Sequence, residues 1–261
     1  MTALSLSARH PGQFLVVGGP TVVFDLAGLR FVTDPTFDPP TDYGFLRKTQ
    51  APTHPAEAFG DVDVVLVSHS AHADNLDHAG RAFALNAPVL LTNPSAAADL
   101  GNPAQGIRPW ESIPVTGDVE VTAVPAQHGP ADGQRDEDGF VNCEVTGFVI
   151  RTPDTTTYVS GDNASLGLVT QIRERVGAID HAVLFAGRAS VPAKFDGRPL
   201  SLTAERAAAA AEVLGAPHVI VAHQTGWAHF TQGPADTARA FQEAGISDRL
   251  DPAEPGRWST R

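Results

Sequence analysis

Cysteine and long hydrophobic runs are scarce in this sequence of 261 residues. Cys143 is its one cysteine, which excludes an intrachain disulfide and a cysteine-based zinc finger. No apolar run approaches the ~18 residues that a membrane-spanning helix needs. The N-terminus has no basic region followed by an apolar stretch, so it does not resemble a signal peptide. We therefore expect a cytoplasmic protein without a membrane partner.

Basic residues are also few, with 18 Lys and Arg against 30 Asp and Glu, a net charge of −12. Such a chain repels phosphate backbones, so we expect no nucleic-acid partner. Hydrophobic residues make up 42% of the chain and its mean hydropathy is −0.09, enough to bury a sizeable core. The length fits one large domain, predicted to span residues 1–261.

Short apolar segments separated by glycine and proline predict a layered α/β fold rather than an all-β barrel. A polar loop rich in Asp and Gly is predicted at 129–139, and Asp74 or Asn75 is the predicted N-cap of the first helix. Strands are predicted at 14–18, 21–26, 29–33, 62–67, 89–92, 119–124, 145–151, 155–160, 182–185 and 219–222, and helices at 76–85, 166–176, 203–214 and 235–244.

Histidine and aspartate side chains follow four of the predicted strands. His69 and His72 come just after the strand at 62–67, and His128, Asp162 and His223 each follow another strand. Loops at strand ends are where layered α/β folds place their sites. Imidazole and carboxylate groups that converge there suit a divalent metal ion such as zinc, manganese or iron.

Other catalytic patterns are missing from the sequence. It contains no Gly-x-Ser-x-Gly, so a serine nucleophile of the hydrolase type has no support. Its glycine-rich turns lack the Gly-Lys-Ser/Thr ending of a phosphate-binding loop, and no strand is followed by Gly-x-Gly-x-x-Gly.

Five segments, in this order, carry a resemblance to a known family. They are Gly18-Gly19-Pro20-Thr21 with Thr33-Asp34-Pro35, residues 68–77, Pro125-Ala126-Gln127-His128-Gly129-Pro130, Ser160-Gly161-Asp162, and Val221-Ala222-His223 followed by Gly226-Trp227-Ala228-His229-Phe230. The chain resembles the metallo-β-lactamase fold superfamily, and particularly its branch similar to ascorbate-6-phosphate lactonase. The resemblance covers about residues 13–241.

The resemblance implies a four-layered αββα sandwich with a metal site on one edge, between the two sheets. His69, His72 and His128 would form the first metal site. Asp74 would belong to a second site, and Asp162 would bridge the two.

His223 would complete the second site with Asp74, and Asp34 would be a carboxylate outside the metal shell that orients a histidine or a loop.

The superfamily's usual signature is His-x-His-x-Asp-His, whereas the spacing here is His69-x-x-His72-x-Asp74-Asn75. Asn75 stands where the last histidine is usual, and Ser70 stands where related sequences carry an aspartate. An amide oxygen is a poorer zinc ligand than an imidazole. We therefore expect a weak or empty second site, and one or two ions, with zinc first and manganese or iron as alternatives.

These residues predict a metal-dependent hydrolase acting on a small-molecule ester, lactone, amide or phosphoester. A bound cation lowers the pKa of its water, Asp74 would orient or deprotonate that water, and His229 or a metal would stabilise the developing oxyanion. The loop at 187–199, which carries Arg188, Lys194 and Arg198, is the predicted substrate-side lid.

Two other functions remain open. Ser70 and Asn75 also fit a degenerate member of the superfamily that binds a ligand without turnover. Redox chemistry at an iron centre is less favoured, because the chain is too short to carry a flavin domain as well. The sequence does not determine the oligomeric state.

Overall fold

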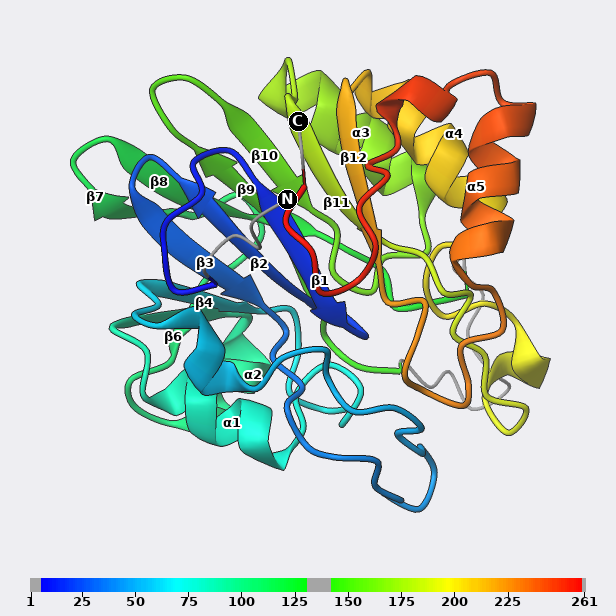
Figure 1. The fold of residues 1–261 in the computed structure, drawn as a ribbon, viewed down its shortest axis with the longest axis horizontal. Coiled ribbons are helices and arrows are strands. Elements are labelled where there is room, and N and C mark those ends of the chain that lie inside the picture. Colours follow the sequence, from blue (N-terminus) through cyan, green and yellow to red (C-terminus); the bar gives the residue numbers. More distant parts are fainter. Residues whose placement is uncertain (1–5, 131–141, 260–261) are drawn as a thin grey trace.

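Two sheets, each of six strands, pack face to face in the computed structural model, which describes residues 6–130 and 142–259 (Figure 1). The strands of the first sheet are adjacent in chain order: β1 (Phe14–Gly18), β2 (Thr21–Leu26), β3 (Leu29–Thr33), β4 (Val64–Val67), β5 (Val89–Thr92) and β6 (Gln105–Gly106). β1, β2 and β3 pair antiparallel, and β3 to β6 pair parallel.

The second sheet repeats this pattern. Its strands are β7 (Ser112–Thr116), β8 (Val119–Pro125), β9 (Thr146–Arg151), β10 (Thr156–Val159), β11 (His181–Phe185) and β12 (His218–Ala222). β7 to β10 form an antiparallel meander, and β10, β11 and β12 pair parallel. In each sheet, therefore, a meander leads into parallel strands whose carboxyl ends share one edge.

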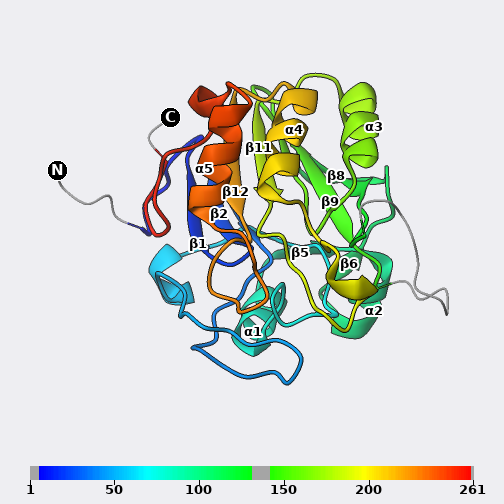
Figure 2. The same ribbon diagram turned by 90° about the vertical axis from the view of Figure 1, so that its right-hand side faces the viewer.

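Helices cover the outer faces of both sheets, so the predicted αββα order of layers is confirmed (Figures 1 and 2). The first sheet carries α1 (His78–Leu85) and α2 (Pro94–Leu100), and the second carries α3 (Leu166–Val176), α4 (Ala204–Leu214) and α5 (Pro234–Glu243). Short 3₁₀ turns lie at Ala56–Phe59, Phe195–Gly197 and Ser247–Arg249. None of the helices in the described residues has the length and apolar character to cross a bilayer.

Apolar side chains fill the three spaces between the four layers. The central space holds Phe24, Phe31, Phe148 and Phe185 from both sheets, and the Phe24 and Phe31 rings stack at 5.2 Å. All four residues of β4 are buried because this strand is covered on both faces, by the other sheet and by the helices.

Several predicted elements differ from the observed ones. The first helix begins at His78, not Leu76, and its N-cap is Asp77, whose carboxylate accepts a hydrogen bond from the Gly80 amide. Asp74 and Asn75 are therefore free to face the site. The short helix α2 was not predicted, because its seven residues show little periodicity. β7 is an edge strand with no fully buried residue, which explains its weak signal. From residue 131 onward, the predicted polar loop at 129–139 lies outside the described residues.

Candidate metal centre

The loops that follow β4, β8, β10 and β12 meet at one edge of the sandwich. β8 and β10 run in the same direction because both are antiparallel to β9, and β12 is parallel to β10 through β11. The carboxyl ends of these strands therefore point to a common edge. Two groups of side chains with metal-ligating atoms converge there.

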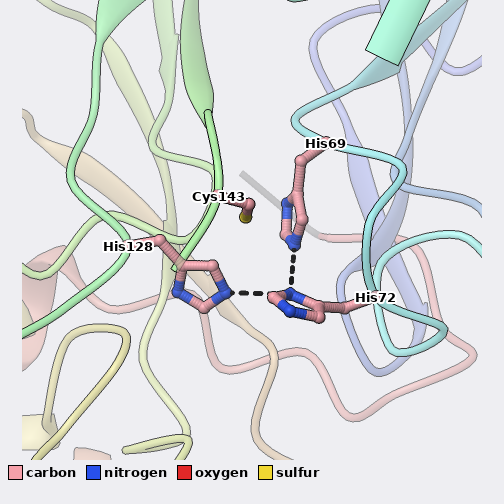
Figure 3. A group of neighbouring side chains, drawn as sticks. All are labelled: His69, His72, His128 and Cys143. Atoms are coloured by element: carbon pink, nitrogen blue, oxygen red, sulfur yellow. Dashed lines mark hydrogen bonds between the residues drawn. The ribbon is translucent and has the colours of Figure 1, made fainter. Parts of the chain in front are cut away.

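The first group, called here the histidine group, contains His69, His72, His128 and Cys143 (Figure 3). His72 lies at its centre, with Nδ1 3.0 Å from Nε2 of His69 and 3.2 Å from Nε2 of His128. One ligand atom from each of the four residues lies within 4.8 Å of the other three. Three imidazole nitrogens at this spacing match the donor set of a borderline divalent ion.

His69 and His128 are each oriented by a contact of the ring nitrogen that faces away from the histidine group. Nδ1 of His69 lies 3.0 Å from the Ser68 hydroxyl, and Nδ1 of His128 lies 2.8 Å from the Leu200 carbonyl oxygen. Such contacts fix the ring orientation and the tautomer of a metal-ligating histidine. Burial, assisted by the neighbouring imidazoles, lowers the pKa of His69 well below its usual value and that of His72 to about 4. Both rings are therefore neutral at pH 7, as ligands must be.

Asp74, Asp162 and His223 form the second group, called here the aspartate group. Nε2 of His223 lies 3.3 Å from Oδ1 of Asp162 and 3.4 Å from Oδ2 of Asp74. The other oxygen of Asp162 lies 3.6 Å from Nε2 of His128. Asp162 thus belongs to the aspartate group and also approaches the histidine group.

The aspartate group contains buried polar atoms without hydrogen-bond partners among the described residues. These are Oδ2 of Asp162 and both ring nitrogens of His223. Burial alone would raise the pKa of Asp74, but His229 and His223 together hold it well below its usual value. Buried polar atoms are costly when unpaired, so a carboxylate and an imidazole aimed at the same point fit a cation.

Two further predicted residues lie just behind the ligand atoms. Oδ1 of Asp34 accepts a hydrogen bond of 2.6 Å from the Ser68 amide, beside His69. Asp34 is buried, which raises the pKa of its carboxyl group well above the usual value. The Asn75 amide donates to Oδ1 of Asp162 at 3.1 Å, and Asn75 is fully buried. Neither residue belongs to the two groups, and both contact residues next to or within them.

A glycine fixes the approach of Asp162 to this edge. Gly161 has a φ of +55°, and a Cβ there would lie 2.6 Å from the Thr146 carbonyl oxygen. Only glycine combines the left-handed backbone with so close a contact. The turn after β10 therefore brings Asp162 against both groups.

A cavity of about 600 Å³ opens beside both groups. His229 lines it, with Nε2 2.9 Å from Oδ2 of Asp74 and its ring packed on Phe230. The predicted lid loop also lines the cavity, but Lys194 is the only one of its three predicted cations to do so. Arg188 instead donates to the Thr231 hydroxyl, and the Arg198 side chain donates to the Phe195 carbonyl.

Sequence reasoning missed two parts of the site. Cys143 has no motif around it in the sequence, yet it lies within the histidine group, where burial raises the pKa of its thiol to about 12. Tyr43, Phe45 and Leu46 also line the cavity. No motif surrounds these residues in the sequence, so only the three-dimensional arrangement identifies them.

The sequence matches the family described as a beta-lactamase superfamily domain over residues 29–224. The chain belongs to this superfamily. It is 27% identical over 212 residues to a UPF0173 metal-dependent hydrolase of Pyrococcus horikoshii, a match that covers 78% of this chain and 85% of the relative.

Solved structures agree with the fold. An isothiocyanate hydrolase from Delia radicum gut bacteria aligns with a TM-score of 0.79 at 20% identity, over 94% of this chain and 97% of that one. A possible metal-dependent hydrolase from Veillonella parvula aligns with a TM-score of 0.80 at 15% identity, over 95% of this chain and 99% of that one. At these identities the likeness establishes the fold of the superfamily.

Proposed function

We propose that this chain is a metal-dependent hydrolase of small molecules. The observation that carries the proposal is the position of Asp162, which contacts His223 in the aspartate group and approaches His128 in the histidine group. One carboxylate between two sets of nitrogen and oxygen donors suits a centre of one or two cations. The related Pyrococcus protein bears the name of a metal-dependent hydrolase, which supports the assignment.

His69, His72 and His128 would hold the first ion, and Asp74, Asp162 and His223 the second. Zinc is the ion that we favour, since three imidazoles match its preferred donors, and manganese or iron are the alternatives. When bound, such a cation lowers the pKa of a water molecule from 15.7 towards ~7 and polarises the carbonyl or phosphoryl oxygen of the substrate.

Asp74 and His229 are the catalytic residues that we propose. Asp74 contacts both His223 and His229, and its carboxylate would orient or deprotonate the attacking water. Nε2 of His229 lies 2.9 Å from Oδ2 of Asp74 and faces the cavity. From there the imidazole can relay that proton or donate a hydrogen bond to the oxyanion. Esters, lactones, amides and phosphoesters of small size all suit this arrangement.

Elemental analysis of protein purified without added metal tests the proposal first. Wild type should hold about one or two equivalents of metal, and the double variant His69→Ala/His128→Ala should hold none. His78→Ala is the matched control, because this histidine is exposed on α1 and lies outside both groups. The wild type is then assayed with the metal found against a panel of esters, lactones, amides and phosphodiesters.

A degenerate binding protein is the second candidate, favoured by Asn75 at the position where histidine is usual. It predicts that wild type takes up no zinc, manganese or iron, and that His72→Ala leaves ligand binding unchanged. Metal uptake together with hydrolysis that His69→Ala/His128→Ala abolishes would exclude it.

A further inference from the structure

A single lysine faces the histidine group from the cavity. Nζ of Lys194 lies 3.1 Å from Nε2 of His72 and 2.6 Å from Oδ1 of Asn142. Among the described residues that line the cavity, no other is lysine or arginine. Lys194 is half-buried, so its charge is only partly screened by water.

The contact between Lys194 and His72 involves the nitrogen that faces away from the other two histidines. Nδ1 of His72 faces His69 and His128, so Nδ1 is the nitrogen that a metal ion would take. A neutral imidazole that binds metal through Nδ1 carries its hydrogen on Nε2. The partner of that N–H is usually a carboxylate, a carbonyl or water.

Lys194 cannot serve as that partner, because a lysine ammonium has three donors and no acceptor. With metal on Nδ1, the Nε2–H of His72 and the ammonium of Lys194 are two donors that point at each other. An acceptor beside the pair, within hydrogen-bond distance of both nitrogens, would satisfy both donors. A negatively charged acceptor would also gain from the lysine charge.

The loop holds Lys194 in this position through its own backbone. The amide of Lys194 donates to the Val191 carbonyl at 2.9 Å. The next two residues, Phe195 and Asp196, have φ values of 48° and 54°, which non-glycine residues rarely adopt. Phe195 is buried against Ala189 and Leu200, which offsets the strain. The fold thus presents Lys194 to the cavity.

The remaining walls of the cavity are mainly apolar and include Phe45, Leu46, Val191 and Leu200. We propose that Lys194 and His72 bind the single anionic group of a small organic acid whose apolar body occupies this cavity. The inference rests on the proposed function and names its substrate class: a hydrolysable monoanion. A cavity with one lysine among its described lining residues, in a chain of net charge −12, would disfavour polyanions.

Calorimetric titration with 3-phenylpropionate and with its neutral analogue 3-phenylpropanol tests the proposal. The two probes share an apolar body and differ in charge. Zinc-loaded wild type should bind the acid more tightly than the alcohol, and Lys194→Met should reduce that preference roughly ten- to hundredfold, the value of one charge-assisted hydrogen bond. Affinity for the alcohol should not change.

Arg188→Met is the matched control, since this arginine belongs to the same loop but does not line the cavity. Its preference for the acid should equal that of wild type. Equal binding of both probes to wild type would overturn the proposal. So would a preference for the acid that survives Lys194→Met, because the acid would then bind the metal alone.

Zinc content, measured for every sample, separates failure of the metal centre from failure of this subsite. In zinc-free protein Nε2 of His72 can accept a hydrogen bond from Lys194, so a smaller preference for the acid is expected there. If the chain takes up no zinc, manganese or iron, the proposed function fails. The titration of zinc-free protein then tests the anion subsite by itself. A preference for the acid over the alcohol that Lys194→Met abolishes supports the subsite. Equal binding of the two probes to zinc-free wild type overturns the subsite.

Discussion

The side-chain amide of Asn75 donates a hydrogen bond of 3.1 Å to Oδ1 of Asp162, the carboxylate that lies between the two groups of candidate ligands. Asn75 is completely buried, and its own amide oxygen has no partner among the described residues. The superfamily's usual histidine at this position would offer an imidazole instead. Asn75 therefore occupies the space of a ligand while stabilising a neighbouring one.

Restoring histidine at this position should strengthen the second metal site. We expect Asn75→His to raise the zinc content from about one to about two equivalents per chain, because an imidazole would join Asp74, Asp162 and His223. Inductively coupled plasma mass spectrometry of dialysed protein measures this. Asn75→Ala, which removes the amide without adding a ligand, should remain at the wild-type value. Two equivalents in wild type would contradict the expectation that the second site is weak.

Much of the fold and of the candidate site was predictable because apolar runs, turn residues and the residues that follow each strand can be identified over a few positions of the sequence. β1, β2 and β3 lie where apolar runs between tight turns placed them. The six predicted ligand residues converge because the strands before them end at one edge, a consequence of sheet direction.

Contacts between distant parts of the chain determine the N-cap of α1, which the sequence did not predict. Asp74, Asn75 and Asp77 are all good N-caps by residue type, and the backbone amides of Phe37 and Asp38 select Asp77 by donating to its carboxylate. Such partners lie some 40 residues away in the chain, beyond the reach of a local pattern.

The buried pair Lys48 and Asp77 should contribute strongly to stability. Nζ of Lys48 lies 2.9 Å from Oδ2 of Asp77, and only 4% of the lysine is exposed. Removing the cation leaves a buried carboxylate without its counter-charge, so Lys48→Met should lower the free energy of unfolding by about 3 kcal/mol. Urea unfolding measures the loss. Arg47→Met, at an exposed neighbour, should change it by less than about 0.5 kcal/mol, and an equal loss in both variants would refute the role of the pair.

Stability should also depend on pH through a histidine far from the metal centre. His181 begins β11, with Nδ1 3.2 Å from Nδ1 of His218, and burial together with His218 lowers its pKa to about 4. The unfolded chain, with an ordinary histidine pKa near 6.5, binds this proton first, so stability is full above about pH 6.5 and falls as the pH drops towards 4.

His181→Gln should remove this part of the pH dependence. Between about pH 7 and about pH 5, wild type should lose about 2 kcal/mol more than the variant, since one pKa unit corresponds to 1.36 kcal/mol. Urea unfolding at the two pH values gives the difference directly. Parallel losses in both proteins would show that His181 titrates normally in the folded state.

His229 should be needed for turnover but not for metal binding. Its Nε2 contacts Asp74 at 2.9 Å and its ring lines the cavity, yet it does not belong to either group of candidate ligands. On the best substrate of the panel, His229→Ala should lower kcat/KM roughly 100-fold, the usual contribution of one acid–base or oxyanion group. Zinc content should stay at the wild-type value, whereas His72→Ala, which removes a ligand of the first site, should lose both zinc and activity. A parallel loss of zinc in His229→Ala would identify His229 as a ligand, and full activity would remove it from the mechanism.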